Sequence, residues 1–140
     1  METAVCQVCM HRCRLKPGQQ GLCRARENQD GEIRCVNYGR ITSLNLDPIE
    51  KKPLKMFYPG SLILSVGSYG CNLRCPFCQN HEISMADGQT AVTGSLPPRE
   101  LVERARKYEP VGNIGGAFTY NEPLVGGEYV RDTAELVHEC

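Results

Sequence analysis

The chain has 140 residues, which suits one domain and excludes a large multidomain assembly. Its 16 basic and 16 acidic residues cancel, so we expect no long-range attraction to nucleic acid or to an anionic membrane. The N-terminal residues lack the features of a secretory signal, and the longest apolar run is too short to span a bilayer. We therefore expect a cytoplasmic protein, in which the nine cysteines bind metal or carry redox chemistry rather than form disulfides.

The first third of the chain predicts little regular structure. Residues 1–30 are rich in Cys, Arg, Gly and Gln and read as loops that something other than a hydrophobic core holds together. The run Asn-Gln-Asp-Gly at 28–31 signals a turn. Two β-prone stretches, 33–38 and 41–46, predict a hairpin. Residues 47–54 contain two prolines and are expected to form a connector.

The remainder predicts a βαβ unit followed by a helix. The apolar run 61–67 is typical of a strand buried on both faces, as in a parallel sheet. A helix capped by Ser95 is expected to end at 109–110, before a second strand at 115–120. A second helix is expected over 127–140 and runs to the last residue without a stop signal. We therefore expect the chain to be truncated.

Three cysteines directly follow the first strand of this unit. Cys71, Cys75 and Cys78 have the spacing Cys-x3-Cys-x2-Cys, in a place where ligands of βα units bind. Iron–sulfur clusters are held by thiolates, and three thiolates hold a four-iron cluster with one iron open to a substrate or cofactor. The alternative is a structural zinc loop with His81 as the fourth ligand.

A second cysteine set precedes the first predicted strands. Cys6, Cys9, Cys13 and Cys23 open with the Cys-x2-Cys spacing of a metal knuckle. Four thiolates suit a closed, structural zinc site that contributes folding energy where the core is small. His11 could replace one ligand, a second iron–sulfur cluster is the rival, and four free thiols in a mobile tail are a further alternative.

The cysteine loop and its neighbours resemble a known family. A Cys-x3-Cys-x-aromatic-Cys loop after the first strand is the hallmark of radical S-adenosylmethionine (radical SAM) enzymes. The wider segments DPIEKKPL (47–54), YPG (58–60) and GCNLRCPFCQN (70–80) resemble the radical SAM member of the AmmeMemoRadiSam system. That branch is similar to pyruvate formate-lyase activating enzymes, and the resemblance covers nearly the whole chain.

The resemblance implies a cofactor chemistry. Cys71, Cys75 and Cys78 would hold a [4Fe–4S] cluster whose open iron chelates S-adenosylmethionine (SAM). Reductive cleavage of SAM would give a 5′-deoxyadenosyl radical that abstracts hydrogen from a substrate. Phe77 matches the aromatic position that lies near the adenine of SAM in relatives.

A second SAM contact is implied after the second strand. Asn121 and Glu122 lie where relatives carry a Gly-Gly-Glu element that contacts the SAM amino group. This chain lacks the two glycines but keeps the carboxylate. The alternative is a polar turn closed by Pro123, with Glu122 in solvent.

The resemblance also implies an architecture. The fold is expected to be α/β, with a cysteine-rich N-terminal module, a β-hairpin and a connector over 1–54. The first βαβ portion of a partial (β/α) barrel would cover 55–140 and would lack the full substrate site. A flavodoxin or ferredoxin would donate the electron to this oxidoreductase, and its substrate would be a protein or a small molecule. No side chain is assigned a catalytic role. The alternative is a non-enzymatic iron–sulfur or zinc module, structural or electron-carrying, which would ignore SAM.

Overall fold

Two small antiparallel sheets open the chain. The computed structural model describes residues 2–139. In it β1 (Ala4–Val5) pairs with β2 (Arg14–Leu15), and β3 (Arg26–Gln29) pairs with β4 (Glu32–Cys35). The β3–β4 turn is Asp30-Gly31, and both residues have positive φ, 53° and 94°, as two-residue hairpins require.

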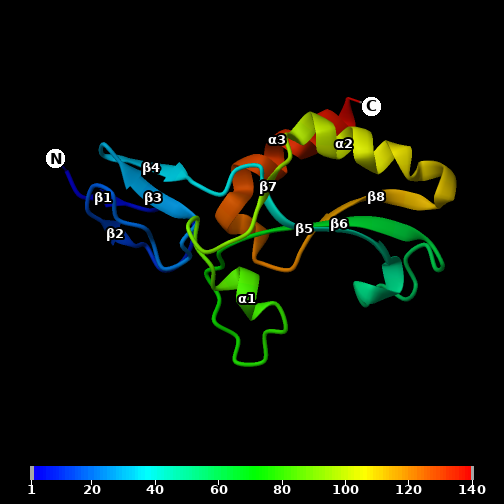
Figure 1. Ribbon diagram of the computed structural model, residues 1–140, viewed down its shortest axis with the longest axis horizontal. Coiled ribbons are helices and arrows are strands. Elements are labelled where there is room, and N and C mark those ends of the chain that lie inside the picture. The colour runs from blue at the N-terminus through cyan, green and yellow to red at the C-terminus, as the bar shows by residue number, and fades with distance from the viewer. Residues whose placement is uncertain (1, 140) are drawn as a thin grey trace.

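A four-stranded sheet forms the centre of the molecule (Figure 1). It contains β5 (Arg40–Pro48), β6 (Leu62–Ser68), β7 (Gly94–Ser95) and β8 (Asn113–Phe118), in the order β7-β5-β6-β8. The strand β6 is antiparallel to β5 and parallel to β8. The parallel pair and the helix between them are the predicted βαβ unit.

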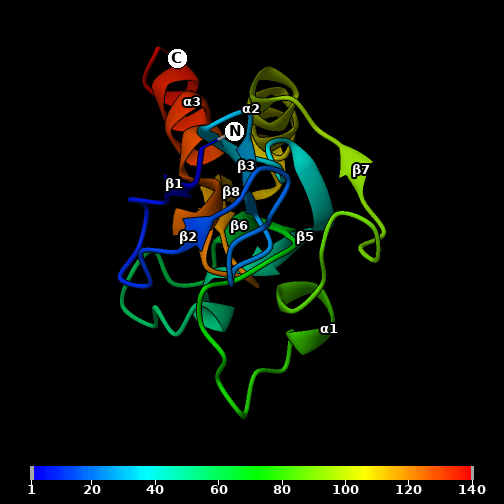
Figure 2. The same ribbon diagram turned by 90° about the vertical axis from the view of Figure 1, so that its left-hand side faces the viewer.

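The helices lie on opposite sides of this sheet. Two long helices, α2 (Pro98–Lys107) and α3 (Gly127–His138), run side by side over one face (Figures 1 and 2). Four short helices complete the fold: η1 (Ile49–Lys51), α1 (His81–Ser84), η2 (Glu109–Val111) and η3 (Pro123–Gly126). Of these, α1 and η1 lie on the other side of the sheet. No helix within residues 2–139 is long and apolar enough to cross a membrane.

The hydrophobic core fills the space between the sheet and the two long helices. Leu64 and Val66 of β6 pack there with Leu101 of α2 and Tyr129 of α3. The Tyr129 ring meets Phe118 edge-on at 5.9 Å, and its hydroxyl donates to the Leu96 carbonyl at 2.8 Å. Because side chains alternate along a strand, the other face of β6 is left free to line a polar site.

The predicted hairpin between 33–38 and 41–46 is wrong. The hairpin lies earlier, between β3 and β4, because the turn residues at 28–31 supply the positive φ that the tight turn needs. β5 instead pairs with β6, from Ile41 opposite Ser68 to Pro48 opposite Leu62. A β-prone pattern does not specify its partner, and only the shared core selects β6.

The Ser95 cap is also wrong. Ser95 belongs to β7, and α2 begins after Pro97, with Pro98 in the first turn and no side-chain cap. The strand at 61–67 and the last helix are confirmed within a residue or two, with residue 140 outside the described residues. The second strand begins two residues earlier than predicted, at Asn113.

An ion pair between a buried arginine and a partly exposed glutamate joins the N-terminal sheets to the last helix. The Arg26 side chain is buried, donates to the Val125 carbonyl at 2.8 Å and forms a two-pronged pair with Glu128. Hydrogen bonds from Arg26 hold the pKa of Glu128 below its ordinary value. The guanidinium thus joins β3 to the segment that starts α3.

We expect Arg26→Met to lower the free energy of unfolding by about 2 kcal/mol, because the Val125 carbonyl stays buried without its donor. Urea denaturation monitored by circular dichroism measures this change. Arg131→Met is the matched control, since it removes an exposed pair with Asp132 on the same helix and should change little. Equal effects of the two substitutions would contradict the role given to Arg26.

Candidate functional site

An open pocket of about 280 Å³ lies beyond the carboxyl ends of β6 and β8. We call it the cysteine pocket. The residues that line it include Cys71, Cys75, Cys78, Tyr120, Asn121 and Glu122. The structure therefore brings the three-cysteine loop and the segment after β8 to one place, as the βαβ topology predicts.

The three cysteines of this pocket differ in exposure. All three are free thiols: Cys71 is buried, Cys78 is partly buried and Cys75 is exposed. The loop turns on itself, since the Cys78 amide donates to the Cys75 carbonyl at 3.1 Å. The Cys78 sulfur lies 3.6 Å from the Ser84 hydroxyl at the end of α1. Across residues 2–139, no three Cys, His, Asp or Glu side chains are grouped closely enough to hold a metal ion.

Asn121 holds the start of the cysteine loop. Its Oδ1 accepts the Ser68 amide at 3.1 Å, and its Nδ2 donates to the Gly70 carbonyl at 2.8 Å. The amide predicted to contact SAM thus spans the end of β6 and the residue before Cys71. In the structure its hydrogen bonds position the loop, although the residue also lines the pocket.

Glu122 lines the cysteine pocket, whereas Phe77 does not. One carboxylate oxygen of Glu122 accepts the Leu124 amide at 3.0 Å and caps η3, as the polar-turn alternative expects, yet the side chain also lines the cysteine pocket. Phe77 is 86% exposed and does not anchor the loop to the core. Phe77 is not one of the residues that line the cysteine pocket.

The segment that joins β1 to β2 carries Cys6, Cys9 and Cys13. The β1–β2 pairing sets Cys6 opposite Cys13, and the Cys6 amide donates to the Cys13 carbonyl at 2.9 Å. Burial raises the pKa of the Cys23 thiol, and the nearby Cys6 and Cys9 raise it further. The zinc at these cysteines stays a prediction.

Two contacts join this N-terminal set to the cysteine loop. His11 Nε2 lies 2.9 Å from the Asn72 carbonyl. A Cβ on Gly70 would lie 2.4 Å from the Cys23 carbonyl, and Gly70 has a φ of +82°, so this packing requires glycine. The two cysteine groups are therefore neighbours in space although nearly fifty residues separate them in the chain.

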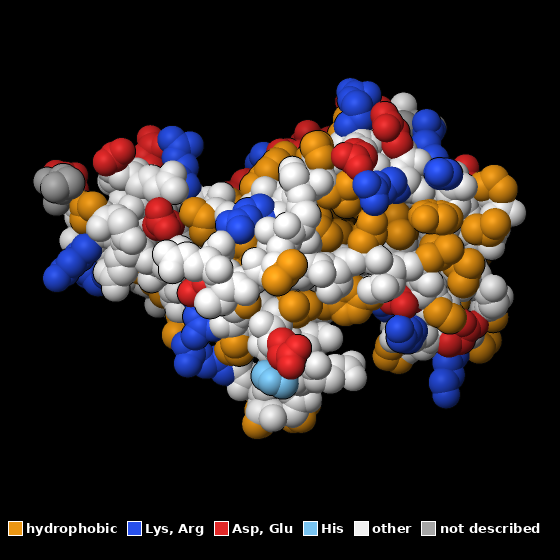
Figure 3. Space-filling view, in the orientation of Figure 1, with side chains coloured by type: hydrophobic (Ala, Val, Ile, Leu, Met, Phe, Trp, Pro, Cys, Tyr) orange, Lys and Arg blue, Asp and Glu red, His pale blue; other side chains and the backbone are white. Residues whose placement is uncertain are grey.

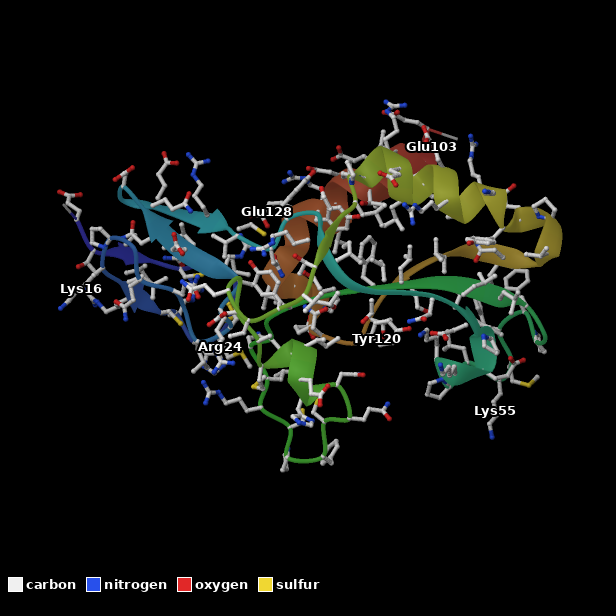
Figure 4. The ribbon with its side chains drawn as sticks, in the orientation of Figure 1. Lys16, Arg24, Lys55, Glu103, Tyr120 and Glu128 are labelled. Carbon is white, nitrogen blue, oxygen red and sulfur yellow. The ribbon has the colours of Figure 1, made fainter. Side chains whose placement is uncertain are left out.

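A second, larger hollow of about 450 Å³ lies on the sheet face that the long helices leave open. We call it the lysine hollow. Its lining includes Asp47, Lys51, Lys52, Ile63, Asn80 and Tyr120, and it shares Asn80 and Tyr120 with the cysteine pocket. Figure 4 shows Tyr120 beneath the sheet, between α1 and the segment that carries Lys55.

Asp47 is the buried centre of the lysine hollow. Lys51 and Lys52 donate to its two carboxylate oxygens, each at 2.9 Å, and the Tyr120 hydroxyl donates at 2.9 Å. Burial by itself would raise the pKa of Asp47, but hydrogen bonds from Lys52 and Lys51 outweigh it and hold the pKa well below its ordinary value.

The sequence pattern does not reveal this cluster. The prolines of residues 47–54 predict only a connector between two elements. The one signal that could have found it is the Lys-Lys pair four and five residues after an aspartate. Strand register is what sets Asp47 opposite Ile63, on the face that Tyr120 covers.

Asp47→Asn should lower the free energy of unfolding by about 2 kcal/mol at neutral pH, since it weakens hydrogen bonds from charged donors. The pKa of Asp47 is depressed on folding, so the wild type holds this advantage above the ordinary value of 3.8. The advantage is lost as the pH falls below that value. Urea titrations from pH 7 to pH 3 measure the difference, and a gap that persists unchanged at pH 3 would contradict the assignment.

Comparison with known proteins agrees with this geometry. Residues 65–139 match the Radical SAM superfamily. The chain is also 40% identical over 134 residues to an uncharacterized protein of Methanocaldococcus jannaschii, an alignment that covers 96% of this chain and 39% of that protein. The chain thus spans about two fifths of the length of that relative, and no solved structure matches. The superfamily match covers more than half of the chain, so the chain belongs to the radical SAM superfamily, whose members typically bind a [4Fe–4S] cluster and SAM.

Proposed function

We propose that Cys71, Cys75 and Cys78 hold a [4Fe–4S] cluster with one open iron, and that SAM binds there. The observation that carries this proposal is the cysteine pocket itself, where three free thiols and the Glu122 carboxylate line one opening. When bound, the reduced cluster and SAM supply a 5′-deoxyadenosyl radical that abstracts hydrogen from a substrate.

The side chains of the loop suit these ligands. In a four-iron cluster each of three irons binds one thiolate. The three cysteines therefore do not need to surround a single atom, as the ligands of one metal ion do. Because Cys71 is buried and Cys75 is exposed, a cluster held by these thiols would lie at the border between the protein and the opening. The exposed Phe77 ring, next to Cys78, is available to cover the adenine of SAM.

Glu122 supplies the charge that SAM requires. A carboxylate accepts a charge-assisted hydrogen bond from the SAM ammonium group. The capping bond from Leu124 occupies one oxygen of Glu122, and a carboxylate has a second oxygen for a ligand. Asn121 acts beside it by holding the loop backbone in place.

The architecture follows from the same proposal. Residues 55–140 would form the first part of a partial (β/α) barrel, with 1–54 as a cysteine-rich module and connector. β5, on the N-terminal side of that division, pairs with β6 on the other side. A zinc ion at Cys6, Cys9, Cys13 and Cys23 would stabilise the module against the cysteine loop.

The wider assignment rests on the resemblance in the cysteine loop and in the segment 47–54. It favours the AmmeMemoRadiSam branch, with chemistry like that of pyruvate formate-lyase activating enzymes. A cytoplasmic flavodoxin or ferredoxin would donate the electron. The substrate would be a protein, as for an activating enzyme, or a small molecule.

Electron paramagnetic resonance of the anaerobically reconstituted, reduced protein tests the cluster. We expect a [4Fe–4S]⁺ signal that shifts when SAM is added. Serine at Cys71, Cys75 or Cys78 should abolish it, whereas Cys35→Ser, in β4 and outside both cysteine sets, should keep it. A signal indifferent to SAM, or zinc retained without iron, would overturn the proposal in favour of a non-enzymatic metal module.

Glu122→Ala should weaken SAM binding by roughly ten- to a hundredfold, the loss of about 1.5–3 kcal/mol for a hydrogen bond to a charged group. Iron content should stay unchanged. Calorimetric titration of the reconstituted protein measures the affinity, with Glu122→Gln keeping the η3 cap while it removes the charge. Glu103→Ala, on the exposed side of α2, is the control. Unaltered SAM affinity in both Glu122 variants would contradict the contact between Glu122 and the SAM ammonium group.

A further inference from the structure

The lysine hollow carries an inference about the substrate. We propose that it binds the acidic group, a carboxylate or a phosphate, of a small-molecule substrate, through Lys52 and Lys51. This inference rests on the proposed function, because the hollow is a substrate site only if the neighbouring cysteine pocket performs radical chemistry.

The charge of the hollow favours an anion. Its lining holds one carboxylate, Asp47, and two ammonium groups, Lys51 and Lys52. One lysine is enough to neutralise one buried carboxylate, so the second leaves an excess positive charge on the wall. A ligand with one negative charge would balance that excess.

Each of the two lysines also has N–H donors that Asp47 does not use and that a ligand could accept. Each ammonium has three N–H donors, and in the structure each gives one to Asp47. The Lys52 side chain is only 15% exposed and lies 5.2 Å from the centre of the Tyr120 ring, which fixes its position. Lys51 is 65% exposed at the mouth and adds a second charge. A largely buried ammonium inside and an exposed one at the mouth are suited to an oxyanion.

The shape of the hollow places such a ligand beside the reaction. Its volume of about 450 Å³ falls in the range of small-molecule sites. The Tyr120 side chain and Asn80 border both openings, and Gln79, the residue after Cys78, lines the hollow. A molecule with its acidic end at Lys52 would therefore present its other end to the cysteine pocket. Figure 3 shows the surface hollowed between the lobe that carries α1 and the lobe that carries η1.

The polar residues of the hollow hold this arrangement without the ligand. Tyr120 donates to Asp47 and accepts from Asn45 at 3.2 Å, so its ring stays between the two openings. Gly67 lies beneath it, where a Cβ would come within 2.7 Å of the ring. Asp47 then fixes Lys52, and Lys52 is the group that meets the acidic end.

Titration calorimetry of the chain at low salt, without iron or SAM, tests the inference with two probes. Inorganic phosphate represents a phosphoester, and malonate represents a carboxylate. We expect at least one probe to bind, and whichever binds more tightly identifies the source of the acidic group. Lys52→Met should weaken binding at least tenfold, Lys51→Met should weaken it severalfold, and Lys52→Arg should retain it.

Lys55→Met is the matched control, because Lys55 lies on the same segment but is not among the residues that line the hollow. The inference is overturned if neither probe binds the wild type, or if Lys55→Met weakens binding as much as Lys52→Met. Thermal melting shows whether Lys52→Met remains folded. If it does not, exposed Lys51→Met decides, and unchanged binding in that variant overturns the inference.

The outcome is independent of the cluster. A chain that binds the probes but shows no SAM-dependent iron signal would retain the anion site and lose the proposed function. If the wild type binds neither probe, the inference is lost. The proposed function would still stand if the Lys52→Met variant gives the SAM-dependent iron signal.

Discussion

The close contact at Gly70 is the constraint on which the site depends. A left-handed glycine without a Cβ lets the Cys23 carbonyl lie against the residue that precedes Cys71. Asn121 holds the same residue by donating to its carbonyl. The N-terminal module, the end of β6 and the segment after β8 therefore meet at one peptide, and each of them constrains where the cysteine loop begins.

The two faces of the central sheet differ in polarity. The face under α2 and α3 is apolar and contributes burial, with Leu64 and Val66 at its centre. The opposite face carries Asp47 and Tyr120 and is closed by short elements only. The hydrogen bonds that several donors make to this buried carboxylate stabilise the polar face. On the other face, the packed core has this role.

The proximity of the two cysteine groups gives the N-terminal module a physical role. His11 contacts the Asn72 carbonyl, and Cys23 packs against Gly70, so the module forms one side of the cysteine loop. The buried Arg26 adds the pair with Glu128 that joins the module to α3. A metal at the N-terminal thiols would rigidify this support, because it would restrain the loops that carry these contacts.

Sequence alone indicated the radical SAM superfamily and most of the local elements of this protein. The cysteine spacing, the apolar strand before it and the two long helices are set by neighbouring residues, and the site at the strand ends follows from the βαβ order. Tertiary structure alone decided that β5 pairs with β6, that Asn121 holds the loop, and that Tyr120 meets Asp47. These are contacts between distant residues, and strand register and shared burial select them, while a local pattern of residues carries neither.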